Sequence, residues 1–309
     1  MSKLVYPFLK IEPTNRCNLS CRLCPVNNAM KRERGDLKFS QFKLVFNSVR
    51  GYIKKINLWN FGEPLLNVDI FKIVKYASSF GAKTTISTNS TILSKDIRDE
   101  ILSSGLFRLI VCIDGADAQT HESYRIGSNF DQIIESIKSL CNQRRKINHS
   151  TPIISVQTLV TKATEKQVDE LIKLCRFLGV DEISFKDISL GSWQPLSEKI
   201  RISSEWLPEN SKLTRYYWRG GVLKIKRRGS VCSWSESNGV VLCNGDLTTC
   251  CYDYDGENVF ANVLKKDYLQ ILESPLMKEI RTKIRKRRFD LCSRCQERNL
   301  VMPSINLRD

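Results

Sequence analysis

The sequence predicts an α/β protein built on a parallel sheet, and three observations support this fold class. Hydrophobic residues make up 41% of the 309 residues, which is enough to bury a core. As far as Asp187, short β-branched runs alternate with segments of helical period. Helices that connect successive strands of one sheet require right-handed crossovers, and such strands are parallel. The length fits one large domain or two smaller ones.

Six short runs predict the strands of this sheet. They are Phe8–Glu12, Lys55–Trp59, Thr84–Thr88, Leu109–Ile113, Ile153–Val160 and Glu182–Lys186. Five segments between them predict helices, near Ser40–Val49, Val68–Ser79, Ser94–Ser103, Phe130–Arg144 and Glu165–Leu178. Ser94 and Thr164 are expected N-caps. Gly81, Gly105 and Gly179 follow helices, where a glycine favours a C-cap.

The twelve cysteines are too dilute for a small disulfide scaffold. The sequence shows no signal peptide and no apolar run near the ~20 residues of a membrane span. We therefore expect a cytoplasmic protein with reduced thiols and no membrane association. Cys112, Cys141 and Cys175 stand alone in apolar periodic segments, which predicts small buried side chains.

Cys17, Cys21 and Cys24 form a C-x3-C-x2-C group. Their spacing also fits one face of a helix, but Pro13 and Pro25 flank the group and favour a loop. A structural zinc site uses four ligands, and neither histidine is near in the sequence. Three thiolates in one loop fit a four-iron cluster better, with one iron left open to a small molecule.

Further motifs follow the next three expected strands. They are Gly62-Glu63-Pro64, Thr88-Asn89 and Asp114-Gly115. Each is an ordinary turn sequence by itself. In parallel α/β sheets the chemistry lies at the carboxyl ends of the strands. With the cysteine loop after the first strand, these motifs indicate one site at that edge.

On these residues the sequence resembles the radical S-adenosylmethionine (SAM) enzymes. The resemblance implies a (βα)6 partial TIM barrel and SAM bound to a [4Fe–4S] cluster on Cys17, Cys21 and Cys24. It implies that Glu63, between Gly62 and Pro64, accepts the methionyl ammonium. The other implied SAM contacts are Thr88, Asn89, Cys112, Asp114, Arg125 for the methionyl carboxylate and Val160 beside the adenine. Phe61, Leu23 and Cys112 depart from the usual residues of the family motifs.

The C-terminal part predicts a β-hairpin at Val240–Leu242 and Leu247–Cys250, then a helical stretch near Tyr268–Arg288. This region resembles the short SPASM form called Twitch, an α+β auxiliary-cluster domain. The resemblance implies a second [4Fe–4S] cluster on Cys232, Cys250, Cys292 and Cys295. A structural zinc ion on the same four residues is the alternative. The expected domains are a barrel at 1–190, a bridging segment at 191–230 and the auxiliary domain at 231–309.

Cys243 and Cys251 remain outside these ligand sets. Packing on the hairpin is one interpretation, and a thiol that donates hydrogen to a substrate radical is the second. The third is ligand exchange between Cys250 and Cys251.

The resemblance implies reductive cleavage of SAM to a 5′-deoxyadenosyl radical that abstracts hydrogen from a C–H bond. We expect a small anionic or sugar-like substrate that is oxidised or epimerised, hence an oxidoreductase or epimerase. The expected barrel starts within ten residues of Met1, which leaves no room for the leader-binding domain of many peptide-modifying relatives. Radical modification of a ribosomal peptide, RNA modification and a non-catalytic metal-binding protein are the alternatives.

The formal charge of +16 is concentrated in two late segments, Lys212–Arg228 and Lys278–Arg288. A solvated basic surface is the simplest interpretation. An anionic substrate, or an acidic electron donor such as flavodoxin or ferredoxin, would also fit. Tyr216, Tyr217 and Trp218 lie within the first segment and would suit stacking on a sugar or base. Nucleic acid is the less favoured partner, because no RNA-binding module accompanies the barrel.

Overall fold

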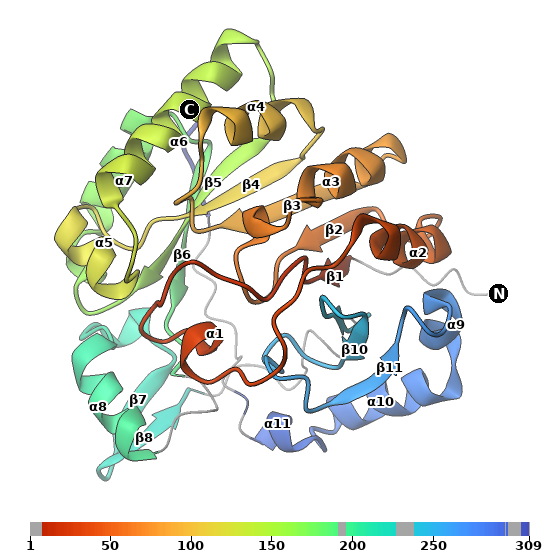
Figure 1. Cartoon of the computed structure of the whole chain (residues 1–309). Helices are drawn as coiled ribbons and strands as arrows, with labels where there is room; N and C mark the ends of the chain where they lie inside the picture. The colour runs from red at the N-terminus through yellow and green to blue at the C-terminus, as the bar shows by residue number, and fades with distance from the viewer. Residues whose placement is uncertain (1–7, 191–195, 227–237, 294, 296–303, 309) are drawn as a thin grey trace.

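The computed structural model describes residues 8–190, 196–226, 238–293, 295 and 304–308, and a ten-stranded sheet organises them (Figure 1). The strand order is β11-β10-β9-β1-β2-β3-β4-β5-β6-β12. Its central strands are β1 (Leu9–Ile11), β2 (Lys55–Leu58), β3 (Lys83–Thr88), β4 (Arg108–Cys112), β5 (Ile153–Val160) and β6 (Glu182–Asp187). These six pair in parallel and in sequence order, as the alternating pattern predicted.

Five longer helices make the crossovers between these strands. They are α2 (Phe39–Val49), α3 (Ile70–Ser79), α4 (Lys95–Ser103), α6 (Phe130–Lys146) and α7 (Val168–Leu178). Each lies within three residues of its predicted bounds. Short elements that the sequence did not indicate are α1 (Pro25–Asn28), η1 (Pro64–Leu66), α5 (Ala118–Tyr124) and η2 (Thr164–Lys166).

The structure confirms the capping predictions for Ser94 and Gly179 and contradicts the one for Thr164. Ser94 caps α4, because its side chain accepts a hydrogen bond from Ile97 N–H. Gly179 ends α7 in the left-handed conformation at φ +74°. Thr164 was wrong as the cap of α7, since its hydroxyl is bound to Leu159 O at 2.8 Å and α7 begins later, after Gln167.

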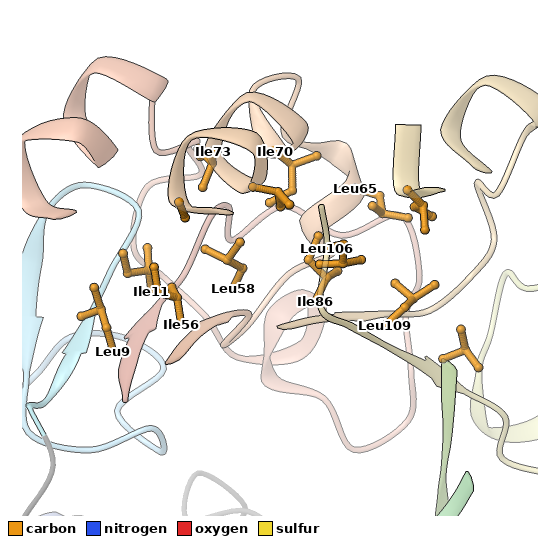
Figure 2. Packing of buried hydrophobic residues seen from close by; sticks show 14 of the residues in the cluster. Leu9, Ile11, Ile56, Leu58, Leu65, Ile70, Ile73, Ile86, Leu106 and Leu109 are labelled. Atoms are coloured by element: carbon orange, nitrogen blue, oxygen red, sulfur yellow. The ribbon is translucent and has the colours of Figure 1, made fainter. Parts of the chain in front are cut away.

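The main core lies between the helices and one face of the sheet. Along β2 to β6, buried side chains alternate with more accessible ones, so every second residue faces the helices. Figure 2 shows buried side chains of β1 to β4 and of α3 gathered in this core. Cys141 and Cys175 belong to it with 1% and 0% exposure, which confirms the prediction for these two thiols. For Cys112 the prediction was wrong, because it lies on the opposite face.

The predicted C-terminal hairpin consists of β9 (Val240–Val241) and β10 (Asp246–Thr248), and β11 (Val259–Asn262) continues it. β9 pairs in parallel with β1, so this hairpin extends the central sheet. At the other edge, β12 (Ile305–Asn306) pairs antiparallel with β6. The barrel segment and the expected auxiliary segment therefore share one sheet.

The helical stretch predicted near Tyr268–Arg288 is confirmed and consists of two helices. The chain forms α9 (Tyr268–Glu273) and α10 (Pro275–Arg285). Ser274 separates them, and its hydroxyl caps α10 by accepting from Met277 N–H at 3.2 Å. Pro275 removes a backbone donor and starts the new helix at its first position. A short α11 (Asp290–Ser293) follows.

The bridging segment folds into α8 (Leu196–Trp206), η3 (Ser211–Leu213) and a separate hairpin of β7 (Tyr216–Arg219) and β8 (Val222–Ile225). Gly220 and Gly221 form its turn with φ of +58° and +71°, values that suit glycine. No helix among the described residues is long and apolar enough to cross a membrane.

Candidate active site

The predicted strand-end motifs surround one cavity at the carboxyl ends of β1 to β4. Its volume is about 150 Å³. Its wall combines the loop after β1, the β2–η1 connection, the ends of β3 and β4, and the end of α5. The predicted residues in this wall are Cys17, Cys21, Cys24, Gly62, Glu63, Thr88, Asn89, Cys112 and Arg125. Parallel strands have thus brought segments far apart in the chain to one place.

Glu63 is the buried acid of the cavity, with 2% exposure. Its Oε1 accepts hydrogen bonds from the Thr88 hydroxyl at 2.8 Å and from Leu65 N–H at 3.1 Å. Its Oε2 accepts from Asn89 N–H at 2.7 Å. Burial raises the pKa of this carboxyl, while the hydrogen bonds oppose that rise. These donors fix the carboxylate between the ends of β2 and β3, and Pro64 beside it begins η1.

Gly62 allows the chain after β2 to touch the start of the cysteine loop. Its φ is +87°, and a Cβ there would lie 2.5 Å from Thr14 O and 2.8 Å from Arg16 O. The next residue, Glu63, donates its N–H to Arg16 O at 2.7 Å. A side chain at position 62 would separate the two segments, so only glycine fits this contact.

Asn89 links the end of β3 to the cysteine loop. Its Nδ2 donates to Asn18 Oδ1 at 2.9 Å and lies 3.9 Å from Cys17 Sγ. Thr88 therefore holds Glu63, whereas Asn89 holds Glu63 through its N–H and the loop beside Cys17 through its side chain.

Burial governs the three thiols of the loop. It raises the pKa of Cys17 and Cys24, and it raises the pKa of Cys21 to about 12. Without metal these thiols are protonated at neutral pH, so binding iron must displace their protons. No three His, Cys, Asp or Glu side chains of the described residues converge as the ligands of a single metal ion. Thiols spread around a cavity fit a cluster instead, because each ligand binds a different iron.

The Arg125 side chain lines the cavity, and a hydrogen bond to Asp114 fixes its guanidinium. Its Nε donates to Asp114 Oδ2 at 2.6 Å, and Asp114 Oδ1 accepts from Leu159 N–H at 2.7 Å. Burial opposes the positive charge, but Asp114 and neighbouring groups raise the pKa of Arg125 well above its ordinary value. Asp114 itself is 1% exposed and is not among the residues that line the cavity. The structure thus gives Asp114 a positioning contact to Arg125.

Two other predicted residues occupy opposite faces of the sheet. Cys112 ends β4 on the face away from the helices, where it lines the cavity and its Sγ lies 3.7 Å from Ser87 Oγ. Val160 is fully buried in the main core on the helix side of β5. Its neighbour Leu159 takes the other face, so the phase of β5 directs Val160 away from the cavity.

Four of the described cysteines of the C-terminal part, Cys250, Cys251, Cys292 and Cys295, are linked by short-range interactions. The Cys250 and Cys251 side chains are hydrogen-bonded, and this bond, with burial, raises the pKa of Cys250. Cys295 is close enough to add to that rise, and its N–H donates to Cys292 O at 3.3 Å. Cys232, the fourth predicted ligand, lies outside the described residues. Cys243 is 4% exposed within the main core, a placement that favours packing.

A family model described as the Radical SAM superfamily matches residues 11–175, which is more than half of the chain. The chain belongs to the radical SAM superfamily. A second model, SPASM, described as an iron–sulfur cluster-binding domain, matches residues 232–296. This radical SAM protein therefore uses SAM and a [4Fe–4S] cluster, and its SPASM region adds an auxiliary iron–sulfur cluster.

Curated relatives match the radical SAM region over different lengths. An "AdoMet-dependent heme synthase" of Methanosarcina barkeri is 30% identical over 169 residues, which are 54% of this chain and 46% of that protein. The chain spans less than half the length of the heme synthases it matches. A "Probable GTP 3′,8-cyclase" of Saccharolobus islandicus is 26% identical over 290 residues, covering 87% of this chain and 90% of that protein.

Solved structures show the same fold at low identity. BtrN in complex with AdoMet and 2-DOIA has a TM-score of 0.57 and 16% identity, and covers 96% of this chain and 98% of its own. Streptococcus suis SuiB bound to S-adenosylmethionine has a TM-score of 0.66 and 18% identity, and covers 90% and 68%.

In this radical SAM protein a polar junction ties the cysteine loop to the SPASM region. Glu12, fully buried at the end of β1, accepts from Arg32 Nη2 at 2.6 Å and from Cys243 N–H at 3.4 Å. Arg32 Nε also donates to Tyr254 O at 2.6 Å, and its backbone N–H donates to Asp255 Oδ1 at 3.0 Å. The sequence analysis missed both Glu12 and Arg32, although an acid that directly follows a buried strand was a local signal.

The bridging segment covers the other side of the cysteine loop. A second hydrophobic cluster joins Leu19, Cys21 and Leu23 of the loop to Tyr124 and to residues of the bridge. The bridge members and their packed neighbours are Ile202, Trp206, Leu207, Tyr216, Leu223 and Ile225. Tyr124 and Trp206 meet edge-on with ring centroids 5.6 Å apart. The bridging segment thus shields the loop that carries Cys17, Cys21 and Cys24.

Sequence reasoning also missed several residues that line the cavity. They are Leu19, Val26, Trp59, Asn60, Phe61 and Ser87. Trp59 and Ser87 had one usable signal, because period-two alternation places them on the same sheet face as Cys112. The others lie in loops, where side-chain direction follows from tertiary packing.

Proposed function

We propose that this radical SAM enzyme abstracts hydrogen from a C–H bond of a small, polar, anionic substrate, which it then oxidises or epimerises. The observation that carries the proposal is one cavity in which thiols, a carboxylate and a guanidinium meet on a polar sheet face. When bound, the cluster and SAM supply the hydrogen-atom abstraction, and the protein supplies orientation and exclusion of water.

The residues fit the two cofactors by donor type. Cys17, Cys21 and Cys24 are the proposed cluster ligands, since thiolate is the ligand that iron–sulfur clusters use. Glu63 offers a carboxylate to an ammonium group. Arg125 donates one N–H to Asp114 and carries further N–H groups in a planar fork that suits a carboxylate. Together they complement the two charged ends of an amino acid, here the methionine part of SAM.

The substrate class follows from the sheet face that bears the cavity, called here the inner face. It is the face of β2 to β6 turned away from the main core. Its members toward the carboxyl ends are Asn57, Thr85, Ser87, Ile110, Cys112, Gln157, Leu159, Ser184 and Lys186. Most are polar. Lys186 adds a positive charge near Cys112, where it acts against the burial that raises the pKa of that thiol.

A polar face with a cation favours an anionic molecule with several hydrogen-bonding groups, because half-buried polar side chains need hydrogen-bonding partners once a ligand excludes water from them. The named activity of the Saccharolobus relative, a GTP cyclase, supports a small anionic substrate of this kind. Peptide modification remains an outcome of the experiment below.

The choice between oxidation and epimerisation rests on the thiols of the SPASM region. Cys251 is half-buried and hydrogen-bonded to Cys250, whereas Cys243 lies in the core. We therefore propose Cys251 as the first candidate for a hydrogen donor and Cys250, Cys292 and Cys295, with Cys232, as auxiliary-cluster ligands. A thiol donor exchanges its hydrogen with solvent, so an epimerised product formed in D2O carries deuterium. An oxidised product carries none at the reacting carbon.

The test begins with anaerobic reconstitution of the full chain and incubation with SAM and dithionite. We expect release of 5′-deoxyadenosine, and we expect Cys17→Ala to abolish this release and to remove the part of the absorbance that comes from the SAM-binding cluster, while the auxiliary cluster keeps its own absorbance. Cys175→Ala is the matched control, because that thiol lies in the main core and should leave both readouts unchanged. Equal 5′-deoxyadenosine release by Cys17→Ala would refute the proposal.

The substrate class is tested by adding pools of phosphorylated metabolites and nucleotides, or pools of short peptides, to the reconstituted enzyme. Faster 5′-deoxyadenosine release with the anionic metabolites supports the proposal. Faster release only with peptides would replace the proposed substrate with a peptide.

A further inference from the structure

The β7–β8 hairpin has two different faces. By register, Tyr216 lies opposite Ile225, and Trp218 lies opposite Leu223, on one face. Tyr216, Leu223 and Ile225 on this face belong to the hydrophobic cluster that also contains Cys17, Cys21 and Cys24. This side of the hairpin is therefore packed toward the cysteine loop.

The opposite side is called here the hairpin face and consists of Tyr217, Arg219, Val222 and Lys224. Tyr217 pairs with Lys224, and Arg219 pairs with Val222. All four are exposed, with 39% of Tyr217 and 53% of Val222 accessible. An aromatic and an aliphatic side chain beside two cations resemble the composition of protein interfaces, in which tyrosine and arginine are enriched.

Both charged side chains of this face are positive, since Arg219 and Lys224 are exposed, whereas the nearby Arg215 is buried in an ion pair with Asp187. Between Asn210 and Lys226 the chain has five Lys or Arg residues and no Asp or Glu. A surface of this kind attracts an acidic partner, and steering by charge raises the rate of encounter.

We infer that the hairpin face is the docking surface for an acidic, one-electron carrier protein with a flavin or iron–sulfur centre. The inference rests on the proposed function, because reductive cleavage of SAM needs an electron from outside the chain. The exposed side binds the carrier, and the packed side belongs to the same hydrophobic cluster as Cys17, Cys21 and Cys24.

The electron balance is simple. The reduced carrier loses one electron and the enzyme gains it at the cluster site, and no bond is made or broken between the two proteins. A transient contact of this type needs little area, below ~1,200 Å². It depends on charge and therefore weakens as salt rises.

The second basic segment provides the matched control. Lys278 and Lys286 are exposed on and just after α10, which lies on the other side of the molecule from the hairpin (Figure 1). The hairpin reversal is the double variant Arg219→Glu/Lys224→Glu, and the α10 reversal is the double variant Lys278→Glu/Lys286→Glu. The two change the net charge equally, but only the hairpin reversal alters the hairpin face.

The experiment uses the reconstituted holoenzyme and recombinant flavodoxin as the probe. Binding is measured by calorimetry at 50 and 300 mM salt, and 5′-deoxyadenosine release is measured with reduced flavodoxin and, separately, with dithionite. We expect the hairpin reversal to weaken flavodoxin binding about tenfold at low salt and to remove most of its salt dependence. Flavodoxin-driven release should fall in parallel, while dithionite-driven release stays at the wild-type level.

Tyr217→Ala tests the uncharged part of the face and should weaken binding at both salt concentrations. Wild-type affinity of the hairpin reversal, or an equal loss in the α10 reversal, would overturn the inference. Failure of the proposed function looks different, because dithionite would then release no 5′-deoxyadenosine from any variant, whatever the binding data show.

Discussion

Arg32 reaches from the cysteine loop to Glu12 at the end of β1 and donates a hydrogen bond of 2.6 Å to this fully buried carboxylate. The same guanidinium lies 3.8 Å from Cys243 Sγ and donates to Tyr254 O. One ion pair thus connects the first strand, the cysteine loop and the SPASM region.

Removal of Arg32 is expected to destabilise the protein strongly. Arg32→Met leaves the Glu12 carboxylate buried with long contacts from Asn60, Phe61 and Cys243 N–H, at 3.3, 3.4 and 3.4 Å. We expect a loss of about 3–5 kcal/mol in the free energy of unfolding, measured by urea titration. Glu12→Gln/Arg32→Met should lose at least ~1 kcal/mol less than the two single changes together. Additive losses would contradict the pairing.

An exposed pair is the control for this cycle. Lys95 and Asp99 lie 2.8 Å apart on α4, but 75% and 49% of their side chains are accessible. Lys95→Met should therefore leave the free energy of unfolding nearly unchanged.

Gly62 and Gly81 form a matched pair for a second prediction. Both have positive φ, +87° and +75°, but a Cβ at position 62 meets Thr14 O at 2.5 Å while one at position 81 meets nothing within 4 Å. Gly81→Ala should cost about 1 kcal/mol from backbone strain alone. Gly62→Ala should cost about 3 kcal/mol or more and lower the iron content, because it displaces the chain just before Cys17. Equal iron content in the two variants would show that this contact does not position the loop.

His121 is expected to make stability depend on pH. Burial lowers its pKa from 6.5 to about 4, with Asp114 and Glu122 raising it and Arg125 lowering it. Its Nδ1 accepts from Asp114 N–H at 3.1 Å, while its Nε2 has no partner among the described residues. The unfolded chain takes up the proton first as pH falls below 6.5, so stability is complete above that pH and declines toward pH 4.

The size of this effect is about 1 kcal/mol at pH 5.5 and about 3 kcal/mol at pH 4. His121→Asn keeps an acceptor near the Nδ1 position and removes the titrating group. The difference in unfolding free energy between wild type and this variant should therefore shift by these amounts between pH 7.5 and the acidic values. A difference that stays constant with pH would show that His121 does not titrate in this window.

Trp206 is expected to protect the cluster loop. Its ring packs on Tyr124 and on the hydrophobic cluster around Cys17 and Cys24. Trp206→Ala should cost about 3 kcal/mol and speed the loss of cluster absorbance in air several-fold, because it opens the cover of the bridge. Trp218→Ala removes an indole that is 51% exposed in the same segment and serves as the control. Equal bleaching rates in the two variants would contradict a shielding role for α8.

Much of the barrel could be predicted from the sequence, because short segments of the chain determine its strands, helices and helix ends. The strands of β2 to β6 and their helices follow from short periodic runs, and Ser94 and Gly179 mark helix ends by their own chemistry. Thr164 does not cap α7, because its hydroxyl donates a hydrogen bond to the carbonyl of Leu159, five residues earlier. The helical stretch at Tyr268–Arg288 was also predicted, and the structure divides it into two helices at Ser274 and Pro275.

The sequence by itself determined the superfamily, since the spacing of Cys17, Cys21 and Cys24 and the motifs after the strands are properties of short segments. Only the tertiary structure decided that Cys112 lines the cavity while Val160 faces the core, because one residue of strand phase separates the two faces. The tertiary structure also joined Glu12 to Arg32 and placed the β7–β8 hairpin in one hydrophobic cluster with the cysteine loop. Such contacts link distant segments, and their free energy comes from burial and pairing that no local pattern encodes.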